Sequence, residues 1–270
     1  MSRRGLFLAG TLLVLLGGCA TAPTGPEGLA AYKANNDPWE PLNRKVFAFN
    51  QAFDRVLLKP VAVGYVRLVP KAGRDSLRNF VLNLHEPVVF GNKVLQGRFG
   101  QAGTTAGRFL LDSTFGVAGL IDVAGRMGLP RQKADMGQTF FVWGVSDGPY
   151  LILPLFGPSN PRDAVGMGLE SYLDPYRWVA ANNNFTPAVA YAPAIIGGVD
   201  ERSRNIDSLN AIQKETIDYY ASFRGLYRQF RAAQLRGDDA SAPPQQEGLY
   251  DDPDSTAPQK PQPDGGSLSH

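Results

Sequence analysis

A long apolar segment lies near the middle of the chain, from Met136 to Asp163. Its first 26 residues carry a single charge, Asp147. Glycine and proline recur every few positions, so the segment can form neither one long helix nor a central strand. The pattern predicts a compact, apolar hairpin or loop. Such a segment must be buried, either in a protein core or in the hydrocarbon of a membrane.

On either side of this segment, apolar residues recur at helical spacing. The sequence from Asp37 to Pro41 is typical of a helix start, and the first helix is expected to run to about Leu58 before Pro60 ends it. Asn50 falls on its apolar face, either as a buried hydrogen-bonding residue or as a polar residue in a passage. Further helices are predicted at 71–84, 88–95, 100–115, 115–125 and 161–179. Residues 178–199 are expected to form a loop and a short apolar helix, because prolines and three consecutive asparagines interrupt them.

The last predicted helix is also the longest, from about Ser203 to Arg236. Its apolar residues recur every three to five positions, with charged residues on the opposite face. At ~1.5 Å per residue it would be about 45–50 Å long, enough to brace a whole domain. Gly237 would end it. The pattern as a whole predicts a mainly α, single domain over 37–236, with strand-like alternation confined to the central segment.

The two ends of the chain differ from this domain. Residues 1–18 read as a signal peptide, in which two arginines precede the apolar run Leu6 to Leu16. That run is too short for a stable membrane anchor, which needs about 20 residues. It closes on Leu16-Gly17-Gly18-Cys19, a lipobox-like sequence that predicts lipidation of Cys19. Residues 19–36 are small and polar, as in a tether, and residues 237–270 have the composition of a disordered tail.

Composition and charge exclude some classes of function. The formal net charge is +2, from 27 basic and 25 acidic residues, so we expect no nucleic-acid partner. Cys19 is the only cysteine, and an exported protein with a single cysteine has no internal disulfide partner for it. Lipidation accounts for that residue. The small residue Ala20 after it indicates sorting to the outer membrane.

The chain offers little for catalysis or metal binding. It has two histidines, one of them the final residue, so we expect no metal site and no cofactor. Gly144-Val145-Ser146-Asp147-Gly148 matches the G-x-S-x-G motif of serine hydrolases, which needs a strand before the serine and a helix after it. Pro149 and Pro154 make that helix improbable, and the only later histidine is His270. We therefore expect a protein that is not an enzyme.

Four blocks of sequence carry a resemblance to a known family. They are DPWEPLNRKVFAFN at 37–50, NLHEP at 83–87, FGVAGLIDVA at 115–124 and the whole central segment at 136–163. Together they are similar to the MlaA/VacJ lipoproteins, in order, from about Asp37 to Phe230.

The resemblance implies a ring of short amphipathic helices in the outer membrane around an amphipathic channel. It implies removal of misplaced phospholipid from the outer leaflet, with a trimeric porin and a soluble periplasmic lipid carrier as partners. The chain would be lipid-anchored and face the periplasm. The expected lining or gating residues are Phe49, Asn50, Gln138, Trp143, Asp147 and Tyr150. The alternative is a structural lipoprotein that scaffolds porins or envelope assembly without moving lipid.

Overall fold

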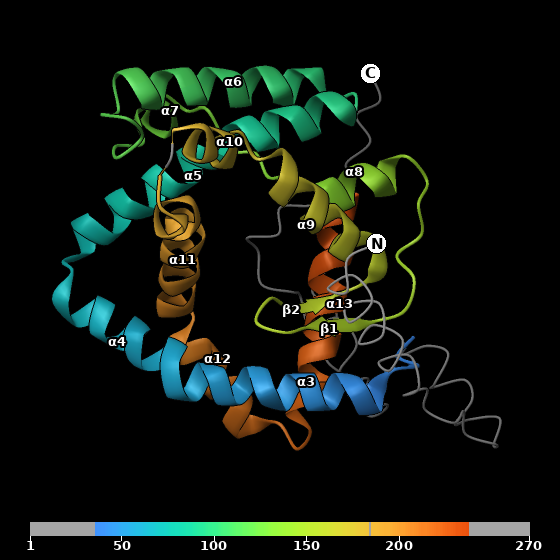
Figure 1. Cartoon of the computed structure of the whole chain (residues 1–270). Helices are drawn as coiled ribbons and strands as arrows, with labels where there is room; N and C mark the ends of the chain where they lie inside the picture. Colours follow the sequence, from blue (N-terminus) through green and yellow to red (C-terminus); the bar gives the residue numbers. More distant parts are fainter. Residues whose placement is uncertain (1–35, 184, 238–270) are drawn as a thin grey trace, which may run out of the picture.

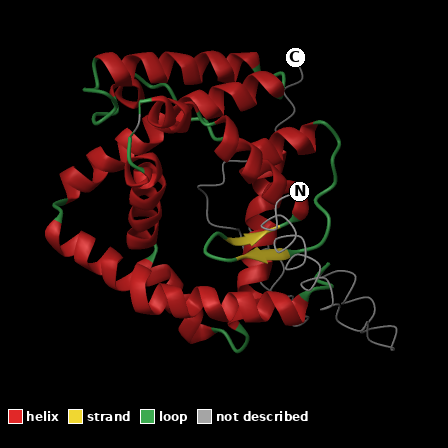
Figure 2. Ribbon diagram, in the orientation of Figure 1, coloured by secondary structure: helices red, strands yellow, loops and turns green. Residues whose placement is uncertain are grey.

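The computed structural model describes residues 36–183 and 185–237, which form a mainly helical ring (Figures 1 and 2). One two-stranded hairpin reaches inward from this ring. The elements of the first half are α3 (Glu40–Phe53), the π-helical turn η2 (Asp54–Leu58), α4 (Lys59–Leu68), α5 (Lys71–Leu95), α6 (Phe99–Thr114), α7 (Val123–Arg126) and α8 (Met136–Val142). Those of the second half are β1 (Leu151–Leu153), β2 (Gly157–Ser159), α9 (Pro161–Leu173), α10 (Pro175–Asn182), α11 (Pro187–Arg204), α12 (Ile206–Glu215) and α13 (Tyr219–Arg236).

The first helix begins near Pro41, as predicted, but Pro60 does not end the helical path. The turn η2 separates α3 from α4, and there the Lys59 N–H bonds the carbonyl of Asp54, five residues back. Pro60 then lies in the first turn of α4, directly after η2, and has no N–H to bond a carbonyl of that turn. The wider π turn lets the chain continue past the proline without a loop.

The two helices expected at 71–84 and 88–95 are one helix, α5, which runs through Pro87. An internal proline removes a hydrogen bond and costs about 3 kcal/mol or more. The buried Glu86 carboxylate, next to Pro87, binds Arg108 of α6 and Arg131 at N–O distances of 3.5 and 2.9 Å. Helix α5 packs against α6, and the Glu86–Arg108 ion pair ties the part of α5 beside Pro87 to that helix.

The helix expected at 115–125 is instead a series of turns, followed by the single helical turn of α7. Val117, Ala118 and Gly119 have φ values of 54°, 56° and 92°, so the backbone here is left-handed and cannot continue a helix. At Gly119 a Cβ atom would lie 2.5 Å from the Cβ of Asn83, so only glycine fits this approach to α5.

The central segment forms a short helix and a hairpin. Asp135 caps α8, accepting a hydrogen bond from the Gln138 N–H at 2.8 Å. Strands β1 and β2 then pair antiparallel, with Leu151 opposite Ser159 and Leu153 opposite Gly157. The expected hairpin is confirmed.

Three helix predictions in the second half are wrong. The helix expected at 161–179 breaks at Asp174, whose side chain caps α10 ahead of Pro175. The region 178–199, expected to be a loop and a short apolar helix, holds the end of α10 and most of α11, an 18-residue helix that includes Pro193, so the helical part is longer than expected. The long helix expected from Ser203 to Arg236 is the end of α11 followed by α12 and α13, because Asp218 starts α13 by accepting the Ala221 N–H at 3.1 Å. Among the described elements the longest helix is α5, with 25 residues.

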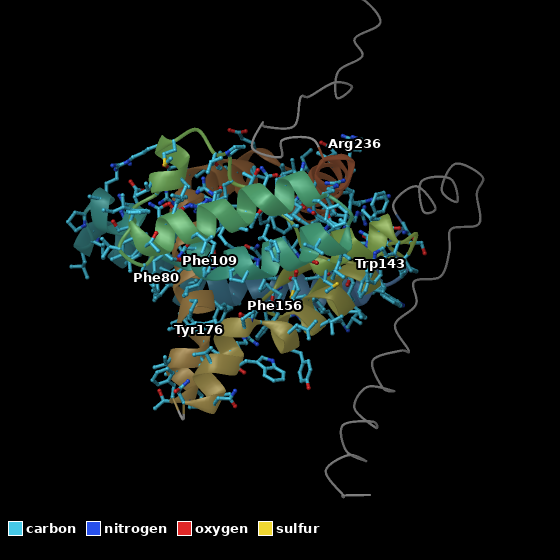
Figure 3. All side chains as sticks on the ribbon, turned by 90° about the horizontal axis from the view of Figure 1, so that it is seen from above. Phe80, Phe109, Trp143, Phe156, Tyr176 and Arg236 are labelled. Carbon is cyan, nitrogen blue, oxygen red and sulfur yellow. The ribbon has the colours of Figure 1, made fainter. Side chains whose placement is uncertain are left out.

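Viewed edge-on, the ring is a flattened disc from which α10 and the adjoining ends of α9 and α11 project on one side (Figure 3). A small hydrophobic cluster joins α3 to the hairpin and α13, and consists of Phe47, Tyr150, Ile152 and Tyr220. Elsewhere the interior is unusually polar. Arg108, Glu86, Asn43 and Thr105 are among the largest fully buried side chains.

Candidate functional site

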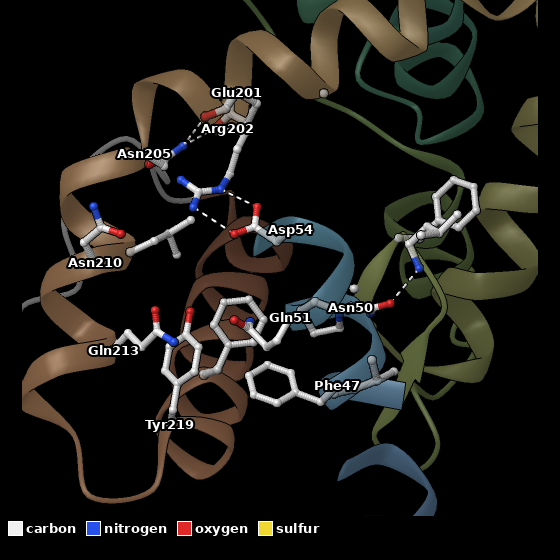
Figure 4. Close-up of a pocket in the computed structure, with 18 residues that line it drawn as sticks. Phe47, Asn50, Gln51, Asp54, Glu201, Arg202, Asn205, Asn210, Gln213 and Tyr219 are labelled. Carbon is white, nitrogen blue, oxygen red and sulfur yellow. Dashed lines mark hydrogen bonds and ion pairs between the residues drawn. The ribbon is translucent and has the colours of Figure 1, made fainter. Parts of the chain in front are cut away.

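A cavity of about 430 Å³ lies between α3, the hairpin and the α11–α13 region (Figure 4). The face of α3 and η2 that borders it carries Phe47, Asn50, Gln51 and Asp54, which recur at helical spacing. The other lining residues are Ile152, Leu155, Phe156, Gly157, Pro158, Gly198, Glu201, Arg202, Asn205, Leu209, Asn210, Gln213, Tyr219 and Phe223.

One end of the cavity is polar. The Arg202 guanidinium binds the Asp54 carboxylate in a two-pronged ion pair, with Nε 2.6 Å from Oδ1 and Nη2 2.9 Å from Oδ2. Hydrogen bonding to Asp54 raises the pKa of Arg202 above its usual value, so the guanidinium stays charged. Nearby, Asn210 accepts a hydrogen bond from the Lys59 ammonium at 2.8 Å.

The other end is aromatic and apolar. The ring of Phe47 lies 5.3 Å from that of Tyr219 and 5.6 Å from that of Phe223, measured between centroids. Leu155 and Phe156, at the hairpin turn, are exposed. The cavity therefore presents the Arg202–Asp54 ion pair at one end and aromatic rings at the other, with the amides of Gln51 and Gln213 beside the rings (Figure 4). This arrangement suits an amphipathic ligand.

Asn50 links this cavity to the hairpin. Its Nδ2 donates to the Leu153 carbonyl at 3.0 Å, and its Oδ1 accepts from the Leu155 N–H at 2.8 Å. Two helical turns earlier, the fully buried Asn43 binds β1 in the same way, donating to the Tyr150 carbonyl and accepting from the Ile152 N–H. The two side-chain amides thus bond backbone groups along one edge of the hairpin, as a neighbouring strand would. Together they fix the position of the hairpin against α3.

The outside of the disc inverts the usual pattern of a water-soluble domain. Among the described residues, 33 large hydrophobic side chains are exposed, whereas 19 polar or charged residues and 11 hydrophobic ones are buried. The exposed set includes Leu68 at the end of α4, and Phe99, Leu110 and Phe115 on or beside α6. Soluble monomers rarely expose contiguous apolar patches on this scale, so this surface is suited to contact with lipid or another apolar partner.

The structure places the six predicted lining residues in different environments. Asn50 borders the main cavity, and Asp147 borders a second, smaller hollow near Phe141 and Arg162. Phe49 and Trp143 are each about half exposed, at 53% and 54%.

Gln138 and Tyr150 are instead buried. The Trp143 indole N–H donates to the Leu95 carbonyl at 3.1 Å, which attaches the end of α8 to α5. The structure thus brings one of the six to the main cavity.

Sequence reasoning missed the charged pair of the cavity, Asp54 and Arg202. Both stand in stretches that read as the solvated faces of amphipathic helices, and they are 148 residues apart. Asp54 lies at helical spacing from Asn50 and Phe47, so the spacing alone could have predicted that it shares a helix face with them. No comparable signal marked Arg202 among the arginines near it.

The hydrolase motif does not have the required geometry. Ser146 follows helix α8 and precedes strand β1, whereas the nucleophile turn of a hydrolase needs a strand first and a helix second. Within residues 36–183 and 185–237 no cluster of histidine, cysteine or carboxylate groups is arranged to hold a metal ion.

A model of the MlaA lipoprotein family matches residues 35–234, which confirms the resemblance of the four sequence blocks. The chain belongs to the MlaA lipoprotein family. It is 32% identical over 228 residues to the intermembrane phospholipid transport system lipoprotein MlaA of Escherichia coli, covering 83% of this chain and 84% of that protein. The lipoprotein of the same name from Haemophilus influenzae is 30% identical over 223 residues, with coverage of 80% and 85%.

The fold has a counterpart among solved structures of this family. The chain matches a structure described as the structural basis for maintenance of bacterial outer membrane lipid asymmetry, with 32% identity and a TM-score of 0.64. The match covers 74% of this chain and 98% of the solved one. The mainly α, ring-like architecture expected from the resemblance is thereby confirmed.

Proposed function

We propose that this chain is an outer-membrane lipoprotein that removes mislocalised phospholipid from the outer leaflet and passes it to a soluble periplasmic carrier. The E. coli and H. influenzae relatives are named for intermembrane phospholipid transport, and the solved relative for outer-membrane lipid asymmetry. The observation that carries the proposal is the inverted surface, apolar outside and polar inside, around an amphipathic cavity.

This surface suits a protein that lies in a bilayer. In hydrocarbon every backbone polar group must be bonded within the protein, and short helices satisfy that demand. Of the described helices, none has both the length and the apolar character needed to cross a membrane. The disc would instead sit among the acyl chains with its exposed leucines and phenylalanines in contact with them, as interfacial amphipathic helices do.

The cavity provides a path suited to both parts of a phospholipid. The headgroup would pass the polar end, near Arg202 and Asp54, where charged and amide groups replace its water. The acyl chains would follow Leu155 and Phe156 at the hairpin turn, both exposed. Because Asn50 holds that turn against α3, we propose that it controls the width of the opening. Phe49, Gln138, Trp143, Asp147 and Tyr150 would support the same segment, and the transport step requires no reaction catalysed by this chain.

Anchoring and partners complete the proposal. Cys19, the proposed site of lipid attachment, lies outside the described residues. A trimeric porin in the same membrane would hold the disc in place, and a periplasmic carrier would receive the lipid from the side facing the periplasm.

Site-directed photocrosslinking tests whether lipid enters the cavity. A photoreactive residue at Gln213, which lines the cavity, is expected to form an adduct with membrane phospholipid. The matched control is Lys214, the next residue, which is exposed but does not line the cavity. Equal labelling at both positions, or none at Gln213, would contradict the proposed path.

A second experiment separates transport from scaffolding. In cells lacking the chain, the transport proposal expects more phospholipid in the outer leaflet, measured by its accessibility to an added phospholipase. Porin assembly, measured by the yield of trimers, should stay normal. Altered trimer yield with unchanged lipid asymmetry would favour a structural lipoprotein.

A further inference from the structure

The Arg202 guanidinium has one donor group that the described protein leaves unused. Nε and Nη2 bind Asp54, but Nη1 finds no acceptor within the described part of the chain. The side chain is only 8% exposed, so little water reaches it. A buried charged donor without an acceptor is costly, and its persistence at a cavity points to a ligand that supplies the acceptor.

The surroundings of Nη1 indicate the charge of that ligand. Asp54 already neutralises Arg202, and the carboxylate of Glu201, which also lines the cavity, is paired with Arg78 at 3.2 Å. The Lys59 ammonium, held by the lining residue Asn210, adds one positive charge at the same end of the cavity. A singly charged anion therefore matches this end better than a neutral or a doubly charged group. Arginine presents its N–H groups in a planar fork suited to phosphate oxygens.

The rest of the cavity indicates what the anion is attached to. Figure 4 shows Arg202, Asn205 and Asn210 gathered at one end, and the rings of Phe47 and Tyr219 at the other. About 430 Å³ holds a group of drug-like size, so a headgroup with its glycerol fits but a whole diacyl lipid does not. Exposed apolar residues at the hairpin turn extend the apolar end outward.

We propose that Arg202 binds the phosphodiester of a phospholipid through Nη1, while Asp54 acts as a positioning residue that holds the guanidinium in place. This assignment rests on the proposed transport function and adds its headgroup contact. A free phosphate ion would offer the same chemistry, so the test must separate the two sources.

The test compares ligands on the full-length lipidated protein in detergent micelles. Radiolabelled phosphatidylcholine is compared with diacylglycerol that has the same acyl chains and no phosphate. A hydrogen bond to a charged group is worth about a 10- to 100-fold change in affinity, so the wild type should prefer the phospholipid by about that factor. Inorganic phosphate at millimolar concentration should displace little of the bound phospholipid, because it lacks the acyl chains.

Two variants test whether the Arg202–Asp54 pair causes the preference for phospholipid over diacylglycerol. Asp54→Asn with Arg202→Gln removes both charges together, so no charge is left buried without a partner, and the preference should fall to about one. Arg202→Lys keeps the charge but loses the fork, and should lower the preference several-fold. The matched control makes the same two changes at Arg44 and Asp218, an exposed two-pronged pair with its shortest N–O distance at 2.6 Å, neither of which lines the cavity. That variant should keep the wild-type preference.

The outcomes separate the inference from the proposed function. Equal binding of both lipids by the wild type overturns the Arg202 assignment and leaves transport standing, whereas binding of neither lipid overturns the transport proposal itself. A preference that survives in both Arg202 variants also overturns the assignment. Full displacement of lipid by inorganic phosphate would identify a free-phosphate site and refute the lipid source. If circular dichroism shows that the double variant is unfolded, Arg202→Lys decides the question.

Discussion

Asn43 and Asn50 lie seven residues apart on α3 and bind the same hairpin strand, but they differ in burial. Asn43 is fully buried and makes three hydrogen bonds, to the Asp37 carboxylate at 2.8 Å, the Tyr150 carbonyl at 3.0 Å and the Ile152 N–H at 2.9 Å. Asn50 makes two bonds at a half-buried position. The pair therefore allows a comparison of the same substitution at two depths.

Asn43→Ala removes three bonds worth about 1 kcal/mol each, and leaves the Tyr150 carbonyl and the Ile152 N–H buried without partners. Since each unsatisfied buried group costs about 1–3 kcal/mol, we expect a total loss of about 3–5 kcal/mol of unfolding free energy. That is a large part of the 5–15 kcal/mol available to a typical domain. For Asn50→Ala we expect about 1 kcal/mol or less, because water can reach the released backbone groups.

Denaturant unfolding in detergent micelles, followed by circular dichroism, measures the two losses. Hydrogen exchange supplies a local readout, in which the Ile152 N–H should lose protection in Asn43→Ala and the Leu155 N–H in Asn50→Ala. A cost below about 1 kcal/mol for Asn43→Ala, or equal costs for the two variants, would refute the view that the buried Asn43 amide stabilises the hairpin through these backbone bonds.

Three further predictions concern the rest of the fold. Arg108→Ala leaves the buried Glu86 and Asp112 carboxylates without this partner, and should cost about 3–5 kcal/mol in denaturant unfolding. By contrast, Lys71→Ala, at the exposed Lys71–Asp75 ion pair, should cost less than about 1 kcal/mol. Gly119→Ala, at a left-handed φ of 92° and close to Asn83, should lower the unfolding free energy by about 1–3 kcal/mol. Gly103→Ala, on α6 where a Cβ atom would meet no neighbouring atom, should raise it by about 0.5–1 kcal/mol. The opposite order of the two melting temperatures would contradict the geometry. Burial, reinforced by the charge of Asp135, raises the pKa of Glu170 from 4.5 to about 7. The neutral carboxyl group therefore gives its full contribution to the unfolding free energy below pH 4.5. That contribution, up to about 3 kcal/mol, is lost as the pH rises through 7. Glu170→Gln should flatten that dependence between pH 5 and 8, and an unchanged slope would show that another group is responsible.

The sequence predicted the helical class, the central hairpin and the first helix start, because these follow from local spacing and from glycine and proline positions. It failed where distant contacts decide the local structure. Pro87 reads as a helix break, but α5 continues through it, and Glu86 beside it is paired with Arg108 and Arg131. The break before α13 was hidden because Ile217 continues the apolar period, although it is exposed in the structure.

The candidate site was only partly predictable for the same reason. Asn50 was identifiable as a polar residue on an apolar helix face, and it borders the cavity. Arg202 looks in sequence like one charged residue among several, and only the fold shows that it faces Asp54 across 148 positions. Burial of a charge is a property of tertiary structure, so no local pattern could have identified that pair.

The central claim is that the disc lies in lipid on its exposed apolar side and keeps a polar cavity within. Cys19 is the only cysteine, so once it is lipidated a single new cysteine can carry a spin label at any chosen position. Labels at Leu110 and Val142, both exposed, are compared with one at Gln213 in the cavity, using collision with oxygen and with a water-soluble nickel chelate in reconstituted vesicles. The account predicts that oxygen dominates at Leu110 and Val142 and the nickel chelate at Gln213; equal exposure of all three labels to the nickel chelate would contradict it.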